Sequence, residues 1–234
     1  MGIDRFLLRL ALLCLPAVLA ANLRAGAEVV AISPRKPNVV LVLADDLGWS
    51  DAGFQGARRH KTPNIDALAQ EGMVFSNFHT CPNCAPSRAA LMTGLYSPRT
   101  GIYTVGDAAR FDSRKCPLQP APNQTRLPLG LKTVAQEMKS LGYATGMFGK
   151  WHLGEEGEYH PSKRGFDEAV VTSVDRHYNF STDPETPHPD GQYLADFVTD
   201  RAVDFIRRHK EQPFFLYLPH LAVHRPLQAD KDAV

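Results

Sequence analysis

The sequence lacks an excess of charge, a long apolar run and any internal repeat, and these shortages exclude several classes of protein. Lys and Arg total 26 against 25 Asp and Glu, and the formal net charge of +1 provides no basic field for nucleic acid. No low-complexity linker divides the chain. The 44% hydrophobic and 22% charged content is that of an ordinary globular protein, neither disordered nor fibrous.

The N-terminal residues predict an export signal. Arg5 and Arg9 accompany an apolar run that ends at Ala20. Ala25-Gly26-Ala27 offers an Ala-x-Ala cleavage site, and Val18-Leu19-Ala20 is a second candidate. The run is shorter than the roughly 20 residues that span a bilayer, which argues against the alternative of an uncleaved anchor. We expect a signal peptide at residues 1–27, a short lead-in at 28–36, and a periplasmic or extracellular location, or a lysosomal one in a eukaryote.

Three cysteines remain after the signal, so they cannot all pair with one another in disulfides. They are Cys81, Cys84 and Cys116. Cys81 and Cys84 have the spacing of a C-x-x-C redox pair, and one interpretation is therefore a thiol oxidoreductase. A buried or disulfide-bonded Cys84 is a second interpretation.

Alternating strand and helix patterns predict an α/β fold with a largely parallel central sheet flanked by helices, over residues 37–234. Strands are expected at 38–44, 73–78, 143–148 and 213–218, and the first is expected to be buried on both faces. Helices are expected at 63–72, 86–94, 131–141 and about 194–206. Because the chain ends soon after a strand and a His-rich loop, we expect the C-terminal portion of the domain to be missing.

Two adjacent carboxylates, Asp45 and Asp46, directly follow the first predicted strand. Ligand sites of α/β sheets lie at the carboxyl ends of strands, and paired carboxylates suit Ca²⁺ or Mg²⁺. A solvated loop pair with a helix-capping aspartate is an equal alternative.

A second group of residues begins at Cys84 and includes Pro86 and Arg88. Proline near a first helical turn places Cys84 at a helix N-terminus, where free amides and the helix dipole favour an anion. Arg88 could then donate hydrogen bonds to anion oxygens. Neither cysteine interpretation above explains the Pro-Ser-Arg run.

Three further side chains are candidates, Lys150, His152 and His224. On an extended segment Lys150 and His152 would point the same way and share one pocket. His220 and His224 lie four residues apart, but nearby prolines favour a loop over a zinc-binding helix, so we expect no zinc there. The other six histidines are expected to be solvated or packed: His60, His79, His160, His177, His188 and His209.

Taken together, these motifs resemble the sulfatase family, within the alkaline-phosphatase-like superfamily, from Pro37 to Pro226. The run C-x-P-S-R with L-x-T-G is similar to the family signature, in which the cysteine is oxidised to formylglycine. The blocks at 62–66 and 149–154 follow in the family's order. The resemblance implies catalytic roles and metal ligands for the following residues: catalytic Cys84, Arg88, Lys150, His152 and His224; metal ligands Asp45, Asp46 and Cys84.

The resemblance also implies hydrolysis of a sulfated saccharide or an aryl sulfate, with Ca²⁺ or Mg²⁺ and with formylglycine as nucleophile. His224 would polarise the leaving oxygen, His152 would take a proton, and a formylglycine-generating or anaerobic sulfatase-maturating enzyme would be a partner. Nucleic acid is not expected as a partner, and the oligomeric state is left open. Alternatives are a phosphonate or phosphate monoester hydrolase and an inactive secreted carbohydrate-binding pseudoenzyme.

Relatives add an Asp-Asn pair and a second lysine, which would lie beyond residue 234 here. We therefore expect residues 1–234 alone to be catalytically silent.

Overall fold

The computed structural model describes residues 36–107, 112 and 117–230. The expected signal peptide, the lead-in up to residue 35 and Cys116 lie outside these residues. Within the described stretches, no helix combines the length and the apolar character that crossing a bilayer requires.

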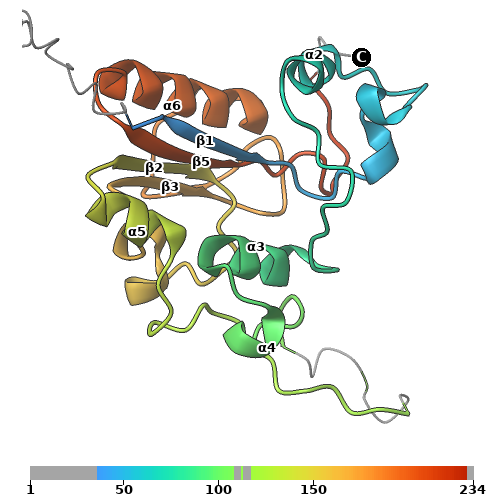
Figure 1. Ribbon diagram of the computed structural model, residues 1–234, viewed down its shortest axis with the longest axis vertical. Coiled ribbons are helices and arrows are strands. Elements are labelled where there is room, and N and C mark those ends of the chain that lie inside the picture. The colour runs from blue at the N-terminus through green and yellow to red at the C-terminus, as the bar shows by residue number, and fades with distance from the viewer. Residues whose placement is uncertain (1–35, 108–111, 113–116, 231–234) are drawn as a thin grey trace, which may run out of the picture. The chain divides into compact units, whose positions relative to one another are not determined.

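A mixed sheet forms the centre of the fold, with its five described strands in the order β1-β5-β2-β3-β4 (Figure 1). The first four strands in this order are parallel neighbours, and β4 joins the edge antiparallel to β3. This confirms the predicted α/β fold with a largely parallel sheet. The strands are β1 Val39–Leu43, β2 Ala144–Gly149, β3 Glu168–Thr172, β4 Thr182–Asp183 and β5 Phe214–Pro219.

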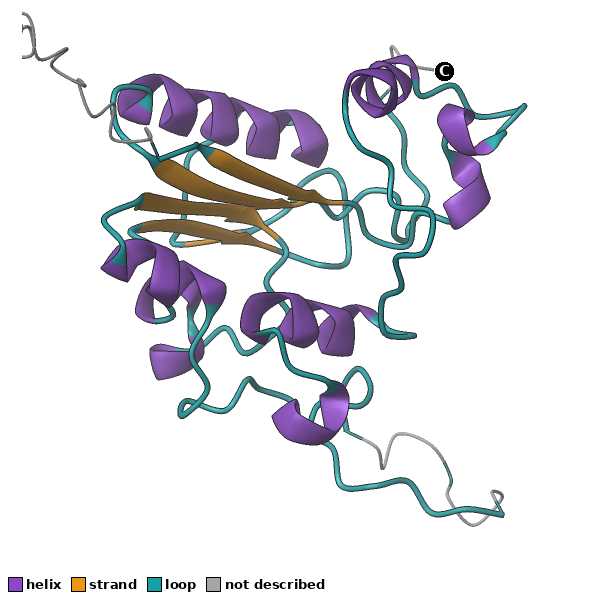
Figure 2. Cartoon of the chain, in the orientation of Figure 1, coloured by secondary structure: helices purple, strands orange, loops and turns teal. Residues whose placement is uncertain are grey.

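Helices cover both faces of the sheet (Figures 1 and 2). Helix α6, Leu194–His209, lies on one face, and α3, Cys84–Thr93, and α5, Val134–Ser140, lie on the other. The shorter described helical elements are η1 Trp49–Asp51, η2 Gly53–Gln55, α2 Pro63–Glu71, α4 Ser97–Thr100, η5 Gly157–Tyr159 and η6 Pro161–Lys163.

Two hydrophobic clusters form the core, one on each face. The stripe on α6 buries Phe197 and Phe205 against Phe214 and Leu216 of β5, and each buried large apolar side chain stabilises the fold by roughly 1.5–3 kcal/mol. This confirms the prediction that the stripe serves core packing. On the opposite face, residues of α3 and α5 pack against the alternate residues of β5 and β2, with Trp151 at the centre.

Two sequence predictions are wrong. Residues 73–78 form no strand, and Met73 and Phe75 are 81% and 70% exposed. An apolar run becomes a strand only where another strand pairs with it, and no described strand lies beside this one. Strand β1 is not buried on both faces: it lies at the sheet edge, and Val40 and Val42 are exposed.

The sheet order brings three strand ends together. Strand β5 lies between β1 and β2, so the segments that follow these three strands meet at one edge. Backbone hydrogen bonds fix this meeting: Asp45 N–H donates to the Ala222 carbonyl at 2.9 Å, and Lys150 N–H donates to the Pro219 carbonyl at 2.9 Å. This edge is where the candidate site lies.

Candidate active site

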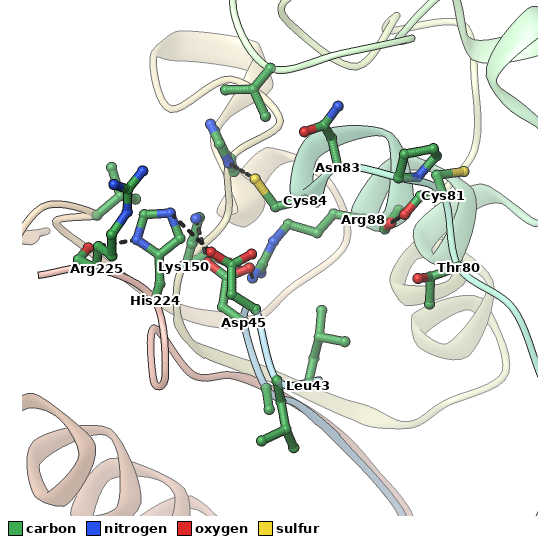
Figure 3. A pocket seen from close by; sticks show the side chains of 18 residues that line it. Leu43, Asp45, Thr80, Cys81, Asn83, Cys84, Arg88, Lys150, His224 and Arg225 are labelled. Carbon is green, nitrogen blue, oxygen red and sulfur yellow. Dashed lines mark hydrogen bonds and ion pairs between the residues drawn. The ribbon is translucent and has the colours of Figure 1, made fainter. Parts of the chain in front are cut away.

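A cavity of about 620 Å³ opens at this edge, and Figure 3 shows the side chains that line it. Every residue that the sequence singled out for catalysis or metal binding lies on its wall. These residues are Asp45, Asp46, Cys84, Arg88, Lys150, His152 and His224.

Cys84 is the first residue of α3, as the proline at 86 suggested. The preceding Asn83 adopts an extended conformation and makes no side-chain capping hydrogen bond, so the first amides of the helix are not satisfied by a side-chain cap. Gly94 ends the helix in the left-handed conformation, with its N–H donating to the Ala90 carbonyl. The half-buried Cys84 thiol therefore lies where backbone N–H groups favour negative charge.

Arg88 lies on the buried face of the same helix, one turn after Cys84. Ala85, Ala89 and Met92 share that face, and the two small alanines leave room for a guanidinium. Its Nη1 donates to the Lys150 carbonyl at 2.6 Å and to the Tyr217 hydroxyl at 3.4 Å. Nε has no hydrogen-bond acceptor, and Nη2 contacts Asp45 as an ion pair without hydrogen-bond geometry, so a fully buried arginine retains donor capacity for a further acceptor.

Asp45 is the carboxylate that accompanies the two buried cations. Its Oδ1 lies 3.2 Å from Arg88 Nη2, and Lys150 Nζ donates to Oδ2 at 2.5 Å. Burial raises the pKa of Asp45, but the hydrogen bond from Lys150 and the charge of Arg88 outweigh burial and hold the pKa below its usual range. Asp45 therefore remains ionised and fixes both cations in place.

His152 lies beside the thiol, with Nδ1 3.3 Å from Cys84 Sγ. Burial, together with the charges of Lys150 and Arg88, lowers the pKa of His152 to about 4. The imidazole is therefore neutral at physiological pH and can accept a proton.

The prediction that Lys150 and His152 lie on an extended segment is wrong. The segment is not extended, because β2 ends at Gly149 and His152 has a φ of 62°. Both side chains line the cavity without strand alternation, and the His152 backbone is left-handed there.

His224 and Asp46 lie at the more exposed side of the cavity. Nδ1 of His224 lies 2.6 Å from the Arg225 carbonyl oxygen, and because a carbonyl only accepts, Nδ1 carries the hydrogen. Nε2 is left to face Asp46, at 3.7 Å from Oδ2. Asp46 itself is exposed and has a φ of 60°.

The donor types fit a hard divalent cation only in part. Asp45 and Asp46 offer carboxylate oxygens of the kind that Ca²⁺ and Mg²⁺ prefer. A Ca²⁺ shell takes about 6–8 oxygens, and among the described residues no group of three or more His, Cys, Asp or Glu side chains is arranged to hold a metal ion. Two carboxylates would thus begin such a shell without completing it.

The sequence analysis missed Tyr217, which contacts Arg88 without lining the cavity, and the lining residue Arg225. Tyr217 was taken only as part of a buried strand, although its alternation with Phe215 places it on the face toward α3; burial raises its pKa to about 12. Arg225, next to His224, also lines the cavity. His220 does not, and its backbone N–H donates to the Leu43 carbonyl.

The two described cysteines are free thiols, and they have different neighbours. Cys81 Sγ lies 3.8 Å from the Ser97 hydroxyl, whereas Cys84 faces His152. The disulfide that a redox pair would form is not present between them.

Comparisons with known proteins agree with the geometry. A family model described as Sulfatase matches residues 37–234. N-acetylgalactosamine-6-sulfatase of Homo sapiens is 36% identical over 223 residues, covering 85% of this chain and 42% of that protein. Arylsulfatase G of Rattus norvegicus is 34% identical, covering 82% of this chain and 42% of that protein. The chain thus spans less than half the length of these relatives.

Solved structures give the same result for the fold. Ps i-CgsB, solved in complex with k-i-k-neocarrahexaose, superposes with a TM-score of 0.72 at 32% identity, covering 85% of this chain and 48% of that one. A second structure, in complex with its substrate D-glucosamine-2-N,6-O-disulfate, gives 0.64 at 28% identity, covering 82% and 35%.

Proposed function

The chain belongs to the sulfatase family, and from that premise we propose that it hydrolyses sulfate esters, converting R–O–SO₃⁻ and water to R–OH and sulfate. The observation that carries the proposal is the set of residues that share the cavity with Cys84. Cys84 begins α3 and contacts the neutral base His152, and the two cations Arg88 and Lys150 line the same cavity. A negatively charged ester group fits that environment.

The nucleophile we propose is formylglycine, made by oxidation of the Cys84 side chain by a maturation enzyme. Once the aldehyde is formed and hydrated, its oxygen can attack sulfur. The thiol itself is not needed for this step. Cys84 is half-buried but lines the cavity, so a substrate can reach it once the chain is folded.

The other residues have separate tasks in this scheme. Arg88 and Lys150 are held in place by Asp45 and offset the negative charge that builds up on the transferred group. His152, with its lowered pKa, accepts a proton on the nucleophile side. His224, when its imidazole carries a hydrogen on both nitrogens, gives the Nε2 proton to the leaving oxygen, because its Nδ1 hydrogen is committed to the Arg225 carbonyl.

A divalent cation, Ca²⁺ or Mg²⁺, would be held by Asp45, Asp46 and the oxygen at position 84. Its chemistry would be to neutralise the sulfonyl oxygens as a Lewis acid.

We propose a sulfated saccharide as the substrate class. Two of the similar proteins are named or solved with sulfated sugars, an N-acetylgalactosamine-6-sulfatase and a complex with a glucosamine disulfate. The cavity of this chain combines charge with open volume, which suits a polar sugar sulfate. Export directed by residues 1–27 would bring the protein to such substrates.

The test begins with the modification at Cys84. Co-expression with a formylglycine-generating enzyme should convert Cys84 to the aldehyde, which peptide mass spectrometry detects, with Cys84→Ala as control. The natural gene product carrying this sequence is then assayed on matched sulfate, phosphate and phosphonate esters. Mass spectra that show only cysteine at position 84, or a Cys81–Cys84 disulfide, would contradict the proposal. Faster turnover of the phosphorus esters would favour the phosphoryl alternative, and a bare thiol with no turnover would favour a pseudoenzyme.

A further inference from the structure

His177 is a buried histidine outside the cavity, and no step described above uses it. Its side chain is 2% exposed, and Nε2 lies 2.9 Å from the backbone carbonyl oxygen of His224. Because a carbonyl oxygen only accepts, Nε2 of His177 carries the hydrogen and donates it. A residue 47 positions earlier in the chain thus holds the backbone of His224.

His177 is itself fixed by several contacts. Its backbone N–H donates to Gln228 Oε1 at 3.0 Å, and its carbonyl accepts from Leu194 N–H at 2.8 Å. Its ring stacks on Tyr193 at 5.8 Å between centroids, and the Tyr193 hydroxyl donates to the Gln228 carbonyl at 3.1 Å. These contacts therefore hold the loop after β5 against the start of α6, and His177 makes most of them.

The other ring nitrogen shows what His177 contributes. Nδ1 is buried and has no hydrogen-bond partner, and an unsatisfied buried polar atom costs about 1–3 kcal/mol. Phenylalanine would stack on Tyr193 without that cost. The single hydrogen bond that the imidazole makes in return is the one to His224.

We propose that His177 is a positioning residue that holds His224 at the cavity, where His224 serves the leaving oxygen. The proposal rests on the sulfate-ester hydrolysis proposed above. The His224 ring is tied through Nδ1 to the carbonyl of the next residue, so a shift of the backbone moves Nε2 as well. A displacement of about 1 Å at a reacting group can cost roughly 10²-fold in rate.

Turnover by two variants separates positioning from general structure. His177→Phe retains the stack on Tyr193 but loses the donor, and we expect its kcat on a saccharide sulfate to fall roughly 10- to 100-fold. On 4-nitrophenyl sulfate the loss should be under about threefold, because 4-nitrophenolate leaves without a proton. His177→Gln places an amide N–H near the same carbonyl and should restore most of the loss. His188→Phe, at a histidine that stacks on Phe180 away from the cavity, is the matched control.

A second measurement does not depend on turnover. The His224 amide donates to the Leu221 carbonyl at 2.8 Å, so its hydrogen exchange should accelerate in His177→Phe, recover in His177→Gln and stay unchanged in His188→Phe. The imidazole nitrogen spectrum of the unmodified protein should show His177 protonated at Nε2. Unchanged exchange, an Nδ1-protonated His177, or equal losses on both substrates would overturn the proposal. If the natural gene product without substitutions, with Cys84 converted to formylglycine, were inactive on both esters, the hydrolase function would be overturned instead, while exchange would still decide the role of His177.

Discussion

Asp45 and Asp46 are adjacent in the sequence, but their carboxylates have opposite surroundings. Asp45 is 4% exposed and contacts two buried cations, whereas the side chain of Asp46 is 59% exposed and has only His224 within 3.7 Å among the described ion-pair partners. A shared role as cation ligands would therefore be accompanied by very different contributions to folding.

Substitution by asparagine separates the two contributions. Asp45→Asn leaves Arg88 and Lys150 buried without their counter-charge, and we expect the free energy of unfolding to fall by roughly 3–5 kcal/mol. Asp46→Asn should change it by at most about 0.5 kcal/mol, since asparagine tolerates the left-handed conformation found there.

Urea denaturation measures these changes, and calorimetric titration of Ca²⁺ into the natural gene product measures binding. Both variants should lose cation affinity. Undiminished Ca²⁺ binding by Asp46→Asn would show that this carboxylate is no ligand.

The lowered pKa of His152 can be tested without turnover. We expect its imidazole to titrate near pH 4 in the unmodified protein. In Lys150→Met the midpoint should rise but remain below 6.5, because burial is the larger cause and one positive charge is gone. Nuclear magnetic resonance titration of the ring protons gives both midpoints. A midpoint near 6.5 in the chain without substitutions would contradict the lowered pKa of His152.

The same shift affects stability. The folded-state pKa of His152 lies below the ordinary value of 6.5, so protonation favours the unfolded chain. The contribution of neutral His152 to the free energy of unfolding is fully present above about pH 6.5 and is lost as the pH falls toward about 4.

At the scale of elements, the closest approach near the site is where β2 ends beside β5. Gly149 has a φ of 130°, and a Cβ there would lie 2.2 Å from the Pro219 carbonyl oxygen. That oxygen also accepts from Lys150 N–H. A side chain at Gly149 would therefore separate the two strand ends that carry Lys150 and the His224 loop.

We predict that Gly149→Ala destabilises the fold by more than the roughly 1–3 kcal/mol of an unfavourable backbone conformation, because a steric clash is added. Gly157→Ala is the matched control, since its φ of 56° is also positive but no atom lies within 4 Å of the added Cβ. It should cost only about 1–2 kcal/mol. Thermal unfolding of both variants gives the comparison, and equal losses would mean that the approach of Pro219 is unimportant.

The sequence predicted the elements that depend on their own composition. The runs that became β5 and α6 are apolar throughout or at helical spacing, so burial could be inferred locally. The run at 73–78 looked similar, but whether it pairs depends on distant residues. The exposure of β1 likewise depends on which strand lies at the edge.

The site was predictable to the same extent. Motifs identified candidate residues from Asp45 to His224, and all of these candidates line the cavity. The contact between His177 and His224 was not predictable, because the two histidines are 47 residues apart and neither flanking sequence specifies the other. The conformation of His152 was also missed, since positive φ is uncommon for any residue other than glycine and the local sequence does not specify it here.

At the scale of the whole molecule, one stretch exposes much apolar surface. Residues 47–78, which we call the 47–78 surface, pack little against the sheet; α2 within it has no buried residue. Its exposed large apolar side chains are Leu47, Trp49, Phe54, Ile65, Leu68, Met73, Val74, Phe75 and Phe78. Exposed apolar side chains in such number favour association between chains.

We predict that the purified chain associates as its concentration rises, and that Leu68→Glu with Phe75→Glu reduces this association without changing the circular dichroism. The two side chains are each 70% exposed, so charge there costs little stability. Leu118→Glu, at an 80% exposed leucine elsewhere, is the control and should have a smaller effect. Light scattering across a dilution series measures the change, and a chain that is monomeric at all concentrations would refute the prediction.

The buried charges at the cavity do not cancel. Arg88 and Lys150 are both 1% exposed, and among the described residues Asp45 is the carboxylate that pairs with them, which leaves one positive charge unmatched. An ester sulfate would offset this charge on entering, as it would the charge that the proposed divalent cation adds, and the inorganic sulfate released from it would be attracted in the same way. The arrangement that draws the substrate in would thus also retain the product. We therefore expect inorganic sulfate to inhibit competitively, and its departure to set the pace of turnover once substrate is plentiful.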